Sequence, residues 1–522
     1  MIREISRRKC LRLWLCKPEY MERTKWENRF VLLRFWKKNY MMFLKDLKRF
    51  KMERLYDKLK AYSESDFYAF HMPGHKRNKT LLGIELPYDL DITEIDGFDD
   101  LHHADGILKE EQERAARVFG AEESHFLVNG STAGILSAVM GCTHRGDKIL
   151  VARHCHKSIY HAIYMNGLVP RYVYPEFDIS MHMNGEISKE DVAKALAAEP
   201  DIKAVVIVSP NYDGVVSDVK GIAEVAHSYR IPLIVDEAHG PHFGFHPAFP
   251  GRANDLGADV VINSLHKTLP SLTQTAILHI NGKLANRRRI KKYLDMLQSS
   301  SPSYIFMASL DACVDFVDGK CEEAFELYVE RLQKFREELK PLQHLQILRT
   351  EHYDISKVVI STANANITSP ELADRLRKEY HLEMEMTGGT YVLAMTTVAD
   401  TQEGLDRLKS ALLEIDDQLE AKTAVSGSIE ISGELPRLEQ YFTPQEAADR
   451  EEDGEAEEIP WKESEGHISL EYAYLYPPGS PVIVPGERIS REAVELLCYY
   501  ETQNLQIEGI QTEGKIKVWK HE

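Results

Sequence analysis

The chain has 522 residues, 43% of them hydrophobic, seven cysteines and a formal net charge of −18. This length accommodates two to four domains with a substantial core, and the acidic balance argues against nucleic acid as the main partner. The cysteines form no C-x-x-C pair, so the sequence indicates neither a disulfide framework nor a zinc site, and we expect a cytoplasmic protein.

The N-terminal segment differs from the rest of the chain. Residues 1–50 contain 15 Lys/Arg and 5 Asp/Glu, a net charge of +10 that leaves −28 on the remainder. The apolar stretch 30–44 is interrupted by three basic residues and has no small-residue cleavage site, so we expect no membrane span and no signal peptide. A basic amphipathic surface helix is one interpretation of this segment. We favour another, in which residues 1–51 are a basic extension from a mis-called start.

From residue 107 onwards, predicted helices and strands alternate. Apolar, β-branched runs predict strands at 125–128, 148–152, 171–174, 204–209, 233–236, 260–263 and 276–280. Helical patterns lie between them, for example at 107–119, 189–198 and 219–229. This alternation predicts a mostly parallel central sheet with helices on both faces, in which ligands bind at the carboxyl ends of the strands.

Lys267 follows one of these strands. The buried run 259–263 leads into the polar turn Ser264-Leu265-His266-Lys267-Thr268. A lysine at a strand end, flanked by hydroxyls and a histidine, suits a Schiff base to an aldehyde cofactor. Asp236 ends another predicted strand 31 residues upstream, and pyridoxal 5′-phosphate (PLP) needs such an acid facing its pyridinium nitrogen. A solvated loop lysine is the alternative for Lys267 alone, but the whole set predicts a PLP site.

The segment Asn129–Gly134 is a second candidate site element. Its Gly/Ser/Thr turn precedes an apolar helix, where free amides and the helix dipole can cradle a phosphate. For this turn alone, an ordinary capped helix is the alternative.

Two other strand-end loops supply histidines. His156 offers a flat ring to stack on the cofactor, although it could equally cap a helix or lie at the surface. His239 lies three residues after Asp236 and could reach the cofactor's phenolic oxygen. Asp236, His239 and His242 could instead hold a metal, but that would leave Lys267 without a role, so we expect no metal.

Several segments resemble the bacterial ornithine/lysine/arginine decarboxylases, namely Ser264–Leu269, Asp236–Gly240, Phe70–Lys76 and Leu127–Gly134. The resemblance runs from about Met52 to the end of the chain and is to the shorter branch, which lacks an N-terminal wing domain. It implies a fold-type I PLP-dependent α/β enzyme with smaller α/β C-terminal domains. Ser480 stands where the family usually has an apolar residue, a departure that affects the local site rather than the fold.

The resemblance also implies roles for the candidate residues. The amino-acid substrate would displace Lys267 from PLP, while Asp236 keeps the ring nitrogen protonated so that the ring withdraws electrons. After CO2 leaves, His266 or Lys267 would return a proton to the Cα. The remaining cofactor-binding residues would be His156 against the ring, His239 at the phenolic oxygen, and Ser131, Thr132, Ser264 and His266 at the phosphate.

We expect a PLP-binding large domain with its N-terminal segment over 52–310, a small α/β domain over 311–420 and a C-terminal domain over 421–522. Residues 446–465 contain ten acids and two bases, which predicts a solvated loop or linker.

The predicted reaction converts arginine to agmatine and CO2, with lysine or ornithine as the next choices. A carboxylate should recognise the cationic side chain of the substrate, and the candidates are Asp96, Asp99, Glu471 and Glu487. The family resembled completes its sites across subunits, so we expect a homodimer or larger homo-oligomer, with the loop 91–106 covering a neighbour's site. The alternatives are an aminotransferase or lyase on the same fold, or a non-catalytic regulator that retains it.

Overall fold

The computed structural model describes residues 54–81, 83–178, 183–421, 434–475, 479–502 and 505–520. The predicted basic extension, residues 1–51, lies outside the described residues. The chain divides into two units, residues 1–58 and 59–522. Helix α3 (Leu55–Ser63) contains the boundary between them, and everything below concerns the second unit.

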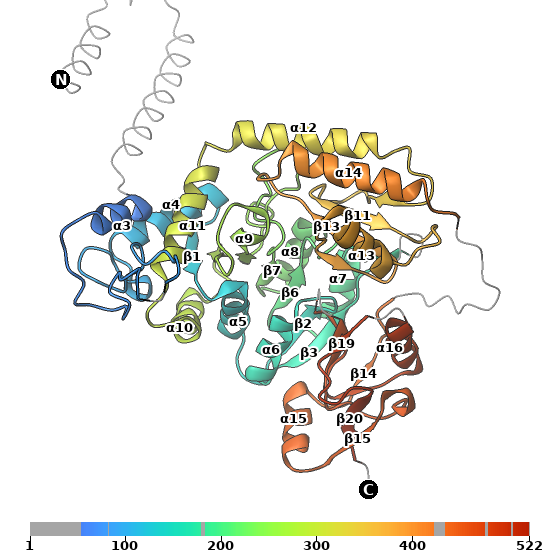
Figure 1. The fold of residues 1–522 in the computed structure, drawn as a ribbon. Coiled ribbons are helices and arrows are strands. Elements are labelled where there is room, and N and C mark those ends of the chain that lie inside the picture. Colours follow the sequence, from blue (N-terminus) through green and yellow to red (C-terminus); the bar gives the residue numbers. More distant parts are fainter. Residues whose placement is uncertain are drawn as a thin grey trace, which may run out of the picture. The chain divides into compact units, whose positions relative to one another are not determined.

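A seven-stranded sheet forms the centre of this unit (Figure 1). Its strand order is β1-β9-β8-β7-β6-β2-β3; the pairs from β8 to β3 are parallel, and β9 is antiparallel to both of its neighbours. The strands are β1 (Glu123–Leu127), β2 (Lys148–Ala152), β3 (Val169–Val173), β6 (Val205–Val208), β7 (Leu233–Asp236), β8 (Val260–Asn263) and β9 (Ala276–Ile280). The predicted mostly parallel sheet is confirmed.

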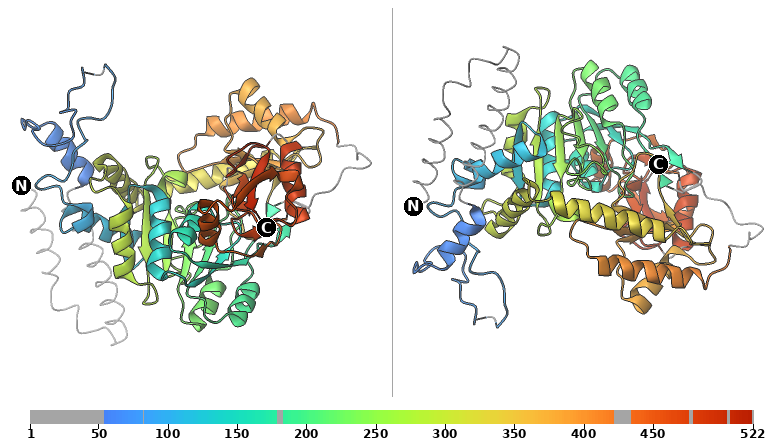
Figure 2. Two further views of the ribbon diagram at one scale, coloured as in Figure 1. Left: turned by 90° about the horizontal axis from the view of Figure 1, so that it is seen from below. Right: turned by 90° about the horizontal axis from the view of Figure 1, so that it is seen from above.

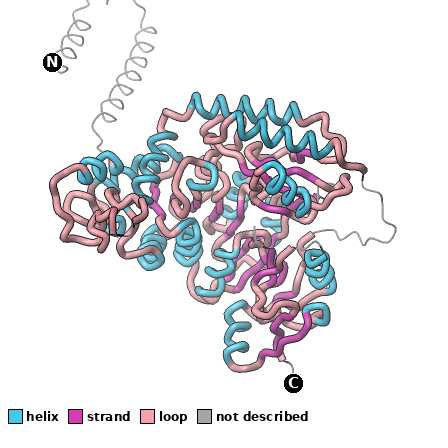
Figure 3. The backbone as a smooth tube through the Cα atoms, in the orientation of Figure 1, coloured by secondary structure: helices cyan, strands magenta, loops and turns pink. Residues whose placement is uncertain are grey.

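Helices cover both faces of this sheet. Every residue of β6, β7 and β8 is buried, and because successive side chains of a strand point to opposite faces, neither face can be open to water. Helix α5 packs against α6 and α10, whereas α7 packs against α8, and Figure 3 shows the strands lying among these helices. The helices are α4 (Ile107–Phe119), α5 (Gly130–Cys142), α6 (Lys157–Met165), α7 (Lys189–Ala198), α8 (Val219–Ser228), α10 (Arg287–Leu297) and α11 (Tyr304–Val317). Two short strands, β4 (Phe177–Asp178) and β5 (Met183–Asn184), pair with each other.

The segment predicted as a small domain contains a four-stranded antiparallel sheet of order β10-β11-β13-β12. Alternate residues of its strand β11 face opposite ways: Val358 and Ile360 pack with α12–α14, whereas Val359 packs with Met183 and Val215 of the large domain. In both views of Figure 2 the long yellow helix α12 runs beside the orange elements of this segment. The elements are α12 (Glu322–Glu338), β10 (Gln346–Leu348), β11 (Lys357–Ser361), α13 (Ser369–Tyr380), β12 (Met386–Thr387), β13 (Tyr391–Met395) and α14 (Gln402–Asp416).

The C-terminal segment forms small sheets with two helices, and here one prediction is wrong. Residues 446–465 are not a linker, because most of them belong to a helix and a paired strand. Thr443 and Glu446 form a capping box with a proline at the helix start, and strand β15 pairs with β20. Most of the ten acids are therefore exposed side chains of a folded segment. The elements are β14 (Glu439–Gln440), α15 (Pro444–Glu452), β15 (Ala456–Pro460), β16 (Ala473–Leu475), β17 (Pro481–Ile483), β18 (Glu487–Arg488), α16 (Arg491–Thr502), β19 (Ile507–Glu508) and β20 (Lys515–Trp519).

The three domain boundaries remain predictions. Among the helices formed by described residues, none combines the length and the apolar character needed to cross a bilayer.

Candidate active site

Asp236 and Lys267 lie at the carboxyl ends of two adjacent parallel strands. Asp236 is the last residue of β7, and Lys267 lies in the short helix α9 (Leu265–Thr268) directly after β8. Burial raises the pKa of the Asp236 carboxyl, and the positive charge of Lys267 opposes this effect. Burial lowers the pKa of Lys267, while Asp236 and Glu385 act in the opposite direction. The two groups therefore lie close enough to stabilise each other's charged forms.

His239 connects Lys267 to a second lysine. The Nε2 atom of His239 lies 2.8 Å from Lys267 Nζ, and its Nδ1 atom lies 3.4 Å from Lys357 Nζ. The Tyr212 ring packs against the imidazole with 4.5 Å between ring centroids. Burial, reinforced by both lysines, holds the pKa of His239 well below its usual range. This histidine is therefore neutral at physiological pH.

The start of helix α5 has backbone amides that could bind an anion, although the Gly130 amide donates to the Gln274 carbonyl at 3.0 Å. Its N-cap residue, Asn129, makes no side-chain capping bond, so the first amides of the helix lack that partner. Ser131 and Ser264 bring the two loops together, because their Oγ atoms lie 2.6 Å apart. Thr132 is exposed beside them. The Nδ1 atom of His266 lies 2.8 Å from the Thr275 carbonyl, to which it donates, leaving Nε2 as the other polar atom of its ring.

His156 has the helix-capping role that we considered as an alternative to stacking. It is the N-cap of α6, and its Nδ1 atom accepts from the amide of Ser158 at 3.2 Å. Burial, followed by the charge of Lys267, lowers the pKa of His156 to about 4. A neutral, half-buried ring near Lys267 can cap the helix with one edge and still present a face to a cofactor.

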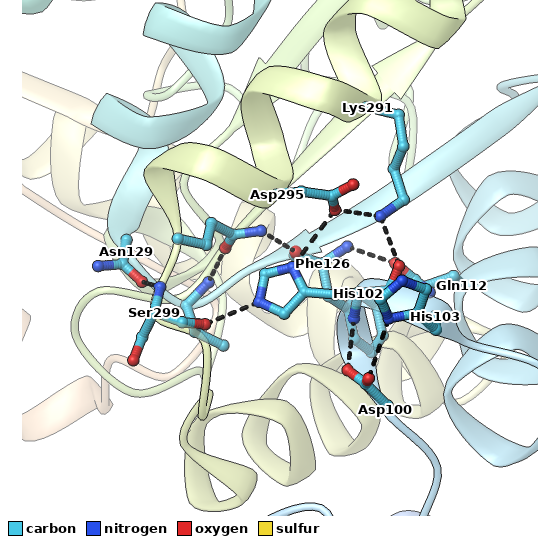
Figure 4. A network of polar contacts seen from close by, with 11 residues as sticks. Asp100, His102, His103, Gln112, Phe126, Asn129, Lys291, Asp295 and Ser299 are labelled. Atoms are coloured by element: carbon cyan, nitrogen blue, oxygen red, sulfur yellow. Dashed lines mark hydrogen bonds and ion pairs between the residues drawn. The ribbon is translucent and has the colours of Figure 1, made fainter.

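The loop 91–106 is connected to the start of α5 by a polar network (Figure 4). His102 Nε2 lies 2.7 Å from the Ser299 carbonyl, and His102 Nδ1 lies 3.3 Å from Asp295 Oδ1. The Ser299 amide donates to Asn129 Oδ1 at 3.2 Å, so the network reaches the start of α5. The paired histidines of this loop therefore hold backbone segments together.

Three of the four candidate acids for the substrate's cation have structural partners. Asp99 accepts bonds from four backbone amides of residues 100–108, and Glu471 accepts from the amides of Gln511 and Lys517. Glu487 is fully buried and binds Arg153 through both carboxylate oxygens, at 2.7 and 2.8 Å. Asp96 is exposed.

The Arg153–Glu487 pair fixes the C-terminal segment to the loop that carries His156. Arg153 is also fully buried and donates to the Val482 carbonyl at 2.9 Å. Ser480, the departure from the family pattern, donates to the carbonyl of His154 at 2.8 Å. The unusual serine therefore helps to hold the loop two residues before His156.

The three side chains of the metal alternative, Asp236, His239 and His242, are directed to different partners. His242 is directed to Thr268 and Asp354, at 2.9 and 3.1 Å, rather than to Asp236. Within the described part of the chain, no group of three or more His, Cys, Asp or Glu side chains is arranged to hold a metal ion.

Sequence reasoning missed the side of the site that comes from beyond the large domain. Lys357 is the first residue of β11, and Glu385 directly precedes β12. The Tyr212 hydroxyl donates to Glu385, and the charge of Glu385 acts on both lysines. Nothing local could have found these residues, because their proximity to Lys267 arises from packing between segments about 90 to 120 residues apart.

These residues fit PLP. A buried acid and a lysine lie at neighbouring strand ends, and seryl hydroxyls stand beside uncapped helix amides that suit a phosphate. Together with the seven-stranded sheet, they define the class of fold-type I PLP-dependent enzymes.

Comparison with known proteins identifies the family. The major domain of Orn/Lys/Arg decarboxylases matches residues 53–371, and the C-terminal domain of these enzymes matches residues 433–514. An arginine decarboxylase of Bacillus subtilis (strain 168) is 33% identical over 471 residues, which cover 87% of this chain and 95% of the relative. The constitutive lysine decarboxylase of Escherichia coli (strain K12) is 23% identical and covers 84% of this chain and 76% of the relative.

The solved structure of the E. coli constitutive lysine decarboxylase has the same fold, with a TM-score of 0.77 at 21% identity, covering 95% of this chain and 84% of that chain. This chain belongs to the Orn/Lys/Arg decarboxylase family, a family of basic amino acid decarboxylases that use PLP.

Proposed function

We propose that this protein decarboxylates arginine to agmatine and CO2. The observation that carries the choice of arginine is the gradient of similarity among relatives. Four proteins named arginine decarboxylase are 32–33% identical over most of this chain, whereas three named lysine decarboxylase are 23–25% identical. Lysine and ornithine are the next candidates.

The residues of this chain divide the work as follows. When bound, PLP supplies an electron sink for the electron pair that remains after CO2 departs. Lys267 attaches the cofactor, and the buried Asp236 holds a proton at the ring nitrogen. With the cofactor bound, His156 would stack on its ring and His239 would reach its phenolic oxygen. The amides of α5 and the side chains of Ser131, Thr132, Ser264 and His266 bind the phosphate, and His266 or Lys267 delivers a proton to the substrate Cα.

Glu385 is the acid we assign to the substrate's cationic group. Asp236 and Glu385 are the two acids whose charge raises the pKa of Lys267, and Asp236 already serves the ring nitrogen. The Glu385 side chain is exposed, and one of its oxygens accepts from Tyr212, whose ring packs on His239. A carboxylate in this position offers the planar recognition that a guanidinium prefers.

We also infer a homodimer or larger homo-oligomer in the cytoplasm. Large apolar side chains gather exposed in the segment 67–86, including Phe67, Phe70 and Leu81, which are 68%, 89% and 76% exposed. Such a group of exposed apolar side chains favours burial by another subunit. The five cysteines in the described part of the chain are free thiols, as a reducing compartment requires. Sedimentation of a fully active monomer would contradict the oligomer.

Product analysis with arginine, lysine and ornithine in parallel tests the function. We expect agmatine and CO2 in equal amounts from arginine and much less amine from the other two substrates, with Lys267→Ala as the inactive control. Release of a keto acid without CO2 would favour the aminotransferase alternative. If a different amino acid is consumed and none of the three yields its amine, the decarboxylase proposal fails.

A further inference from the structure

A second lysine, Lys357, is buried next to the candidate active site. Lys357 has no exposed surface, and its stem packs so tightly against Gly214 that a Cβ there would lie 2.7 Å from Lys357 Cγ. No described acid lies within ion-pair distance of its Nζ atom, whose neighbour is His239 Nδ1 at 3.4 Å. A buried cation that faces an imidazole instead of a carboxylate is uncommon and calls for a reason.

The charges around Lys357 come from several elements. Burial, followed by the charge of Lys267, lowers the pKa of Lys357 to about 8. The charges of Asp354, Glu385 and Asp213 act in the opposite direction. Lys357 is therefore mostly protonated at neutral pH. His156 and His266 also act electrostatically on His239. Both have lowered pKa values, so neither competes as a cation at neutral pH.

The acids near Lys357 have partners of their own. Asp354 accepts from Ser356 Oγ at 2.7 Å and lies 3.1 Å from His242 Nε2. Asp213 accepts from the Tyr391 hydroxyl at 2.6 Å. Removing the charge of Lys357 therefore leaves no buried carboxylate without a hydrogen bond.

The direction of the hydrogen bonds follows from these positions. An ammonium group only donates, so Nδ1 of His239 must accept from Lys357. In a neutral imidazole the proton then resides on Nε2, the atom that lies 2.8 Å from Lys267 Nζ. Because Nε2–H donates, Lys267 must accept through its lone pair, which only the neutral amine possesses.

We propose that Lys357 is a positioning residue that acts through His239 to present Lys267 as a neutral amine, the form that reacts with an aldehyde. This inference rests on the proposed function only for the identity of Lys267 as the reacting lysine, and it is independent of which amino acid is the substrate. The charge of Lys357 adds to the effect, because two ammonium groups separated by one imidazole destabilise each other.

The pH dependence of covalent labelling tests this in full-length protein freed of cofactor. Acetic anhydride modifies only neutral amines, and peptide mass spectrometry reports the labelling of Lys267 at each pH. The variants are Lys357→Met, which removes the donor and the charge, and Lys357→Arg, which keeps both. Lys378→Met is the control, because Lys378 is exposed on α13 and bonded to Asp374.

We expect the midpoint for Lys267 labelling to rise by about one pH unit in Lys357→Met, which is a tenfold loss of neutral amine below the midpoint. The midpoint should stay at the wild-type value in Lys357→Arg and Lys378→Met. In a His239→Phe background, Lys357→Met should shift the midpoint by clearly less, because the relay is already broken. An unchanged midpoint in Lys357→Met, or the same shift in both backgrounds, would overturn the proposal.

A measurement on the wild-type protein covers the case in which Lys357→Met does not fold. Neutron diffraction from perdeuterated, cofactor-free crystals would locate the deuterons on His239. We expect a deuteron on Nε2 and two on Lys267 Nζ. A deuteron on Nδ1, or three on Lys267, would refute the relay, and neither result depends on the outcome of the product analysis.

Discussion

Lys267 and Lys357 differ in how accessible their side chains are. Lys267 follows a parallel strand, is half-buried and lies beside the uncapped start of α5 through Ser264. Lys357 begins an antiparallel strand and has no exposed surface. Burial lowers the pKa of both, yet only Lys267 can be reached by a small molecule. A lowered pKa is therefore common to both lysines of the site, and it is the accessibility of the side chain that identifies Lys267 as the reacting residue.

Replacing each lysine in turn tests whether the two have different roles, and we expect the largest effect here. Lys267→Ala should abolish cofactor attachment and lower decarboxylation by roughly a thousand-fold or more, because the nucleophile itself is lost. Lys357→Met should retain the cofactor and lose about tenfold in kcat at neutral pH, in line with its smaller neutral-amine fraction. Steady-state kinetics and absorbance spectra check both. Equal losses in the two variants would erase the distinction.

Asp236 provides the next test, because it is the charged partner of the accessible lysine. Asp236→Asn should lower kcat by roughly a hundred-fold or more, since charge that develops at the cofactor ring during reaction loses its partner. The dissociation constant for PLP should change much less. Nearly wild-type turnover with weakened cofactor binding would assign Asp236 to binding alone.

Arg153 is a buried cation that, unlike Lys357, has its own carboxylate partner, Glu487. Glu487→Gln should destabilise the fold by about 3–5 kcal/mol, because the guanidinium is left buried without a counter-charge. The double variant Arg153→Met/Glu487→Leu should recover part of this loss. Denaturant unfolding measures the stability. If Glu487→Gln instead keeps full stability and changes which amino acid is accepted, then Glu487 belongs to the substrate site.

How much of this could be predicted from the sequence depends on the range of the interaction. The predicted strands that end in Asp236 and Asn263 have the same bounds in β7 and β8, because short apolar runs closed by polar turns are local signals. The strand ends carrying Ser131, Asp236 and Lys267 were predicted to meet, because parallel strands align their carboxyl ends. Lys357 and Glu385 could not be predicted, since only tertiary packing brings them to His239. The acidic segment 446–465 was wrongly predicted as a loop or linker, because its composition indicates only that it is exposed to solvent. Its structure is determined by the capping box and by the pairing of β15 with β20.

A buried carboxyl offers a smaller, pH-dependent contrast to the lysines. Burial, followed by the charge of Asp311, raises the pKa of Glu111 to about 8. An acid whose pKa is higher in the folded state than in the unfolded state stabilises the fold fully below the unfolded pKa and loses this contribution as the pH rises through 8. Glu111→Gln imitates the neutral form at every pH. The unfolding temperature of this variant, relative to that of the wild type, should therefore rise by a few degrees as the pH increases from about 5 to about 8. A constant difference over that range would contradict the raised pKa.

The smallest effect is expected at the N-terminus. A chain that begins at Met52 should keep PLP binding and activity within about twofold of the full-length protein, because the family match begins at residue 53 and the site residues all lie beyond it. Activity and cofactor content of the two chains, purified in the same way, provide the check. A loss of PLP on truncation would show that residues 1–51 belong to the working protein.

The most direct test of the proposed site is to find which lysine carries the cofactor. Purified protein reduced with borohydride and digested with a protease should yield one peptide bearing the reduced pyridoxyl group, and mass spectrometry should place that group on Lys267. The peptide that contains Lys357 should be unmodified. A pyridoxyl group on Lys357, or on any lysine that remains modified in Lys267→Ala, would contradict the site described above.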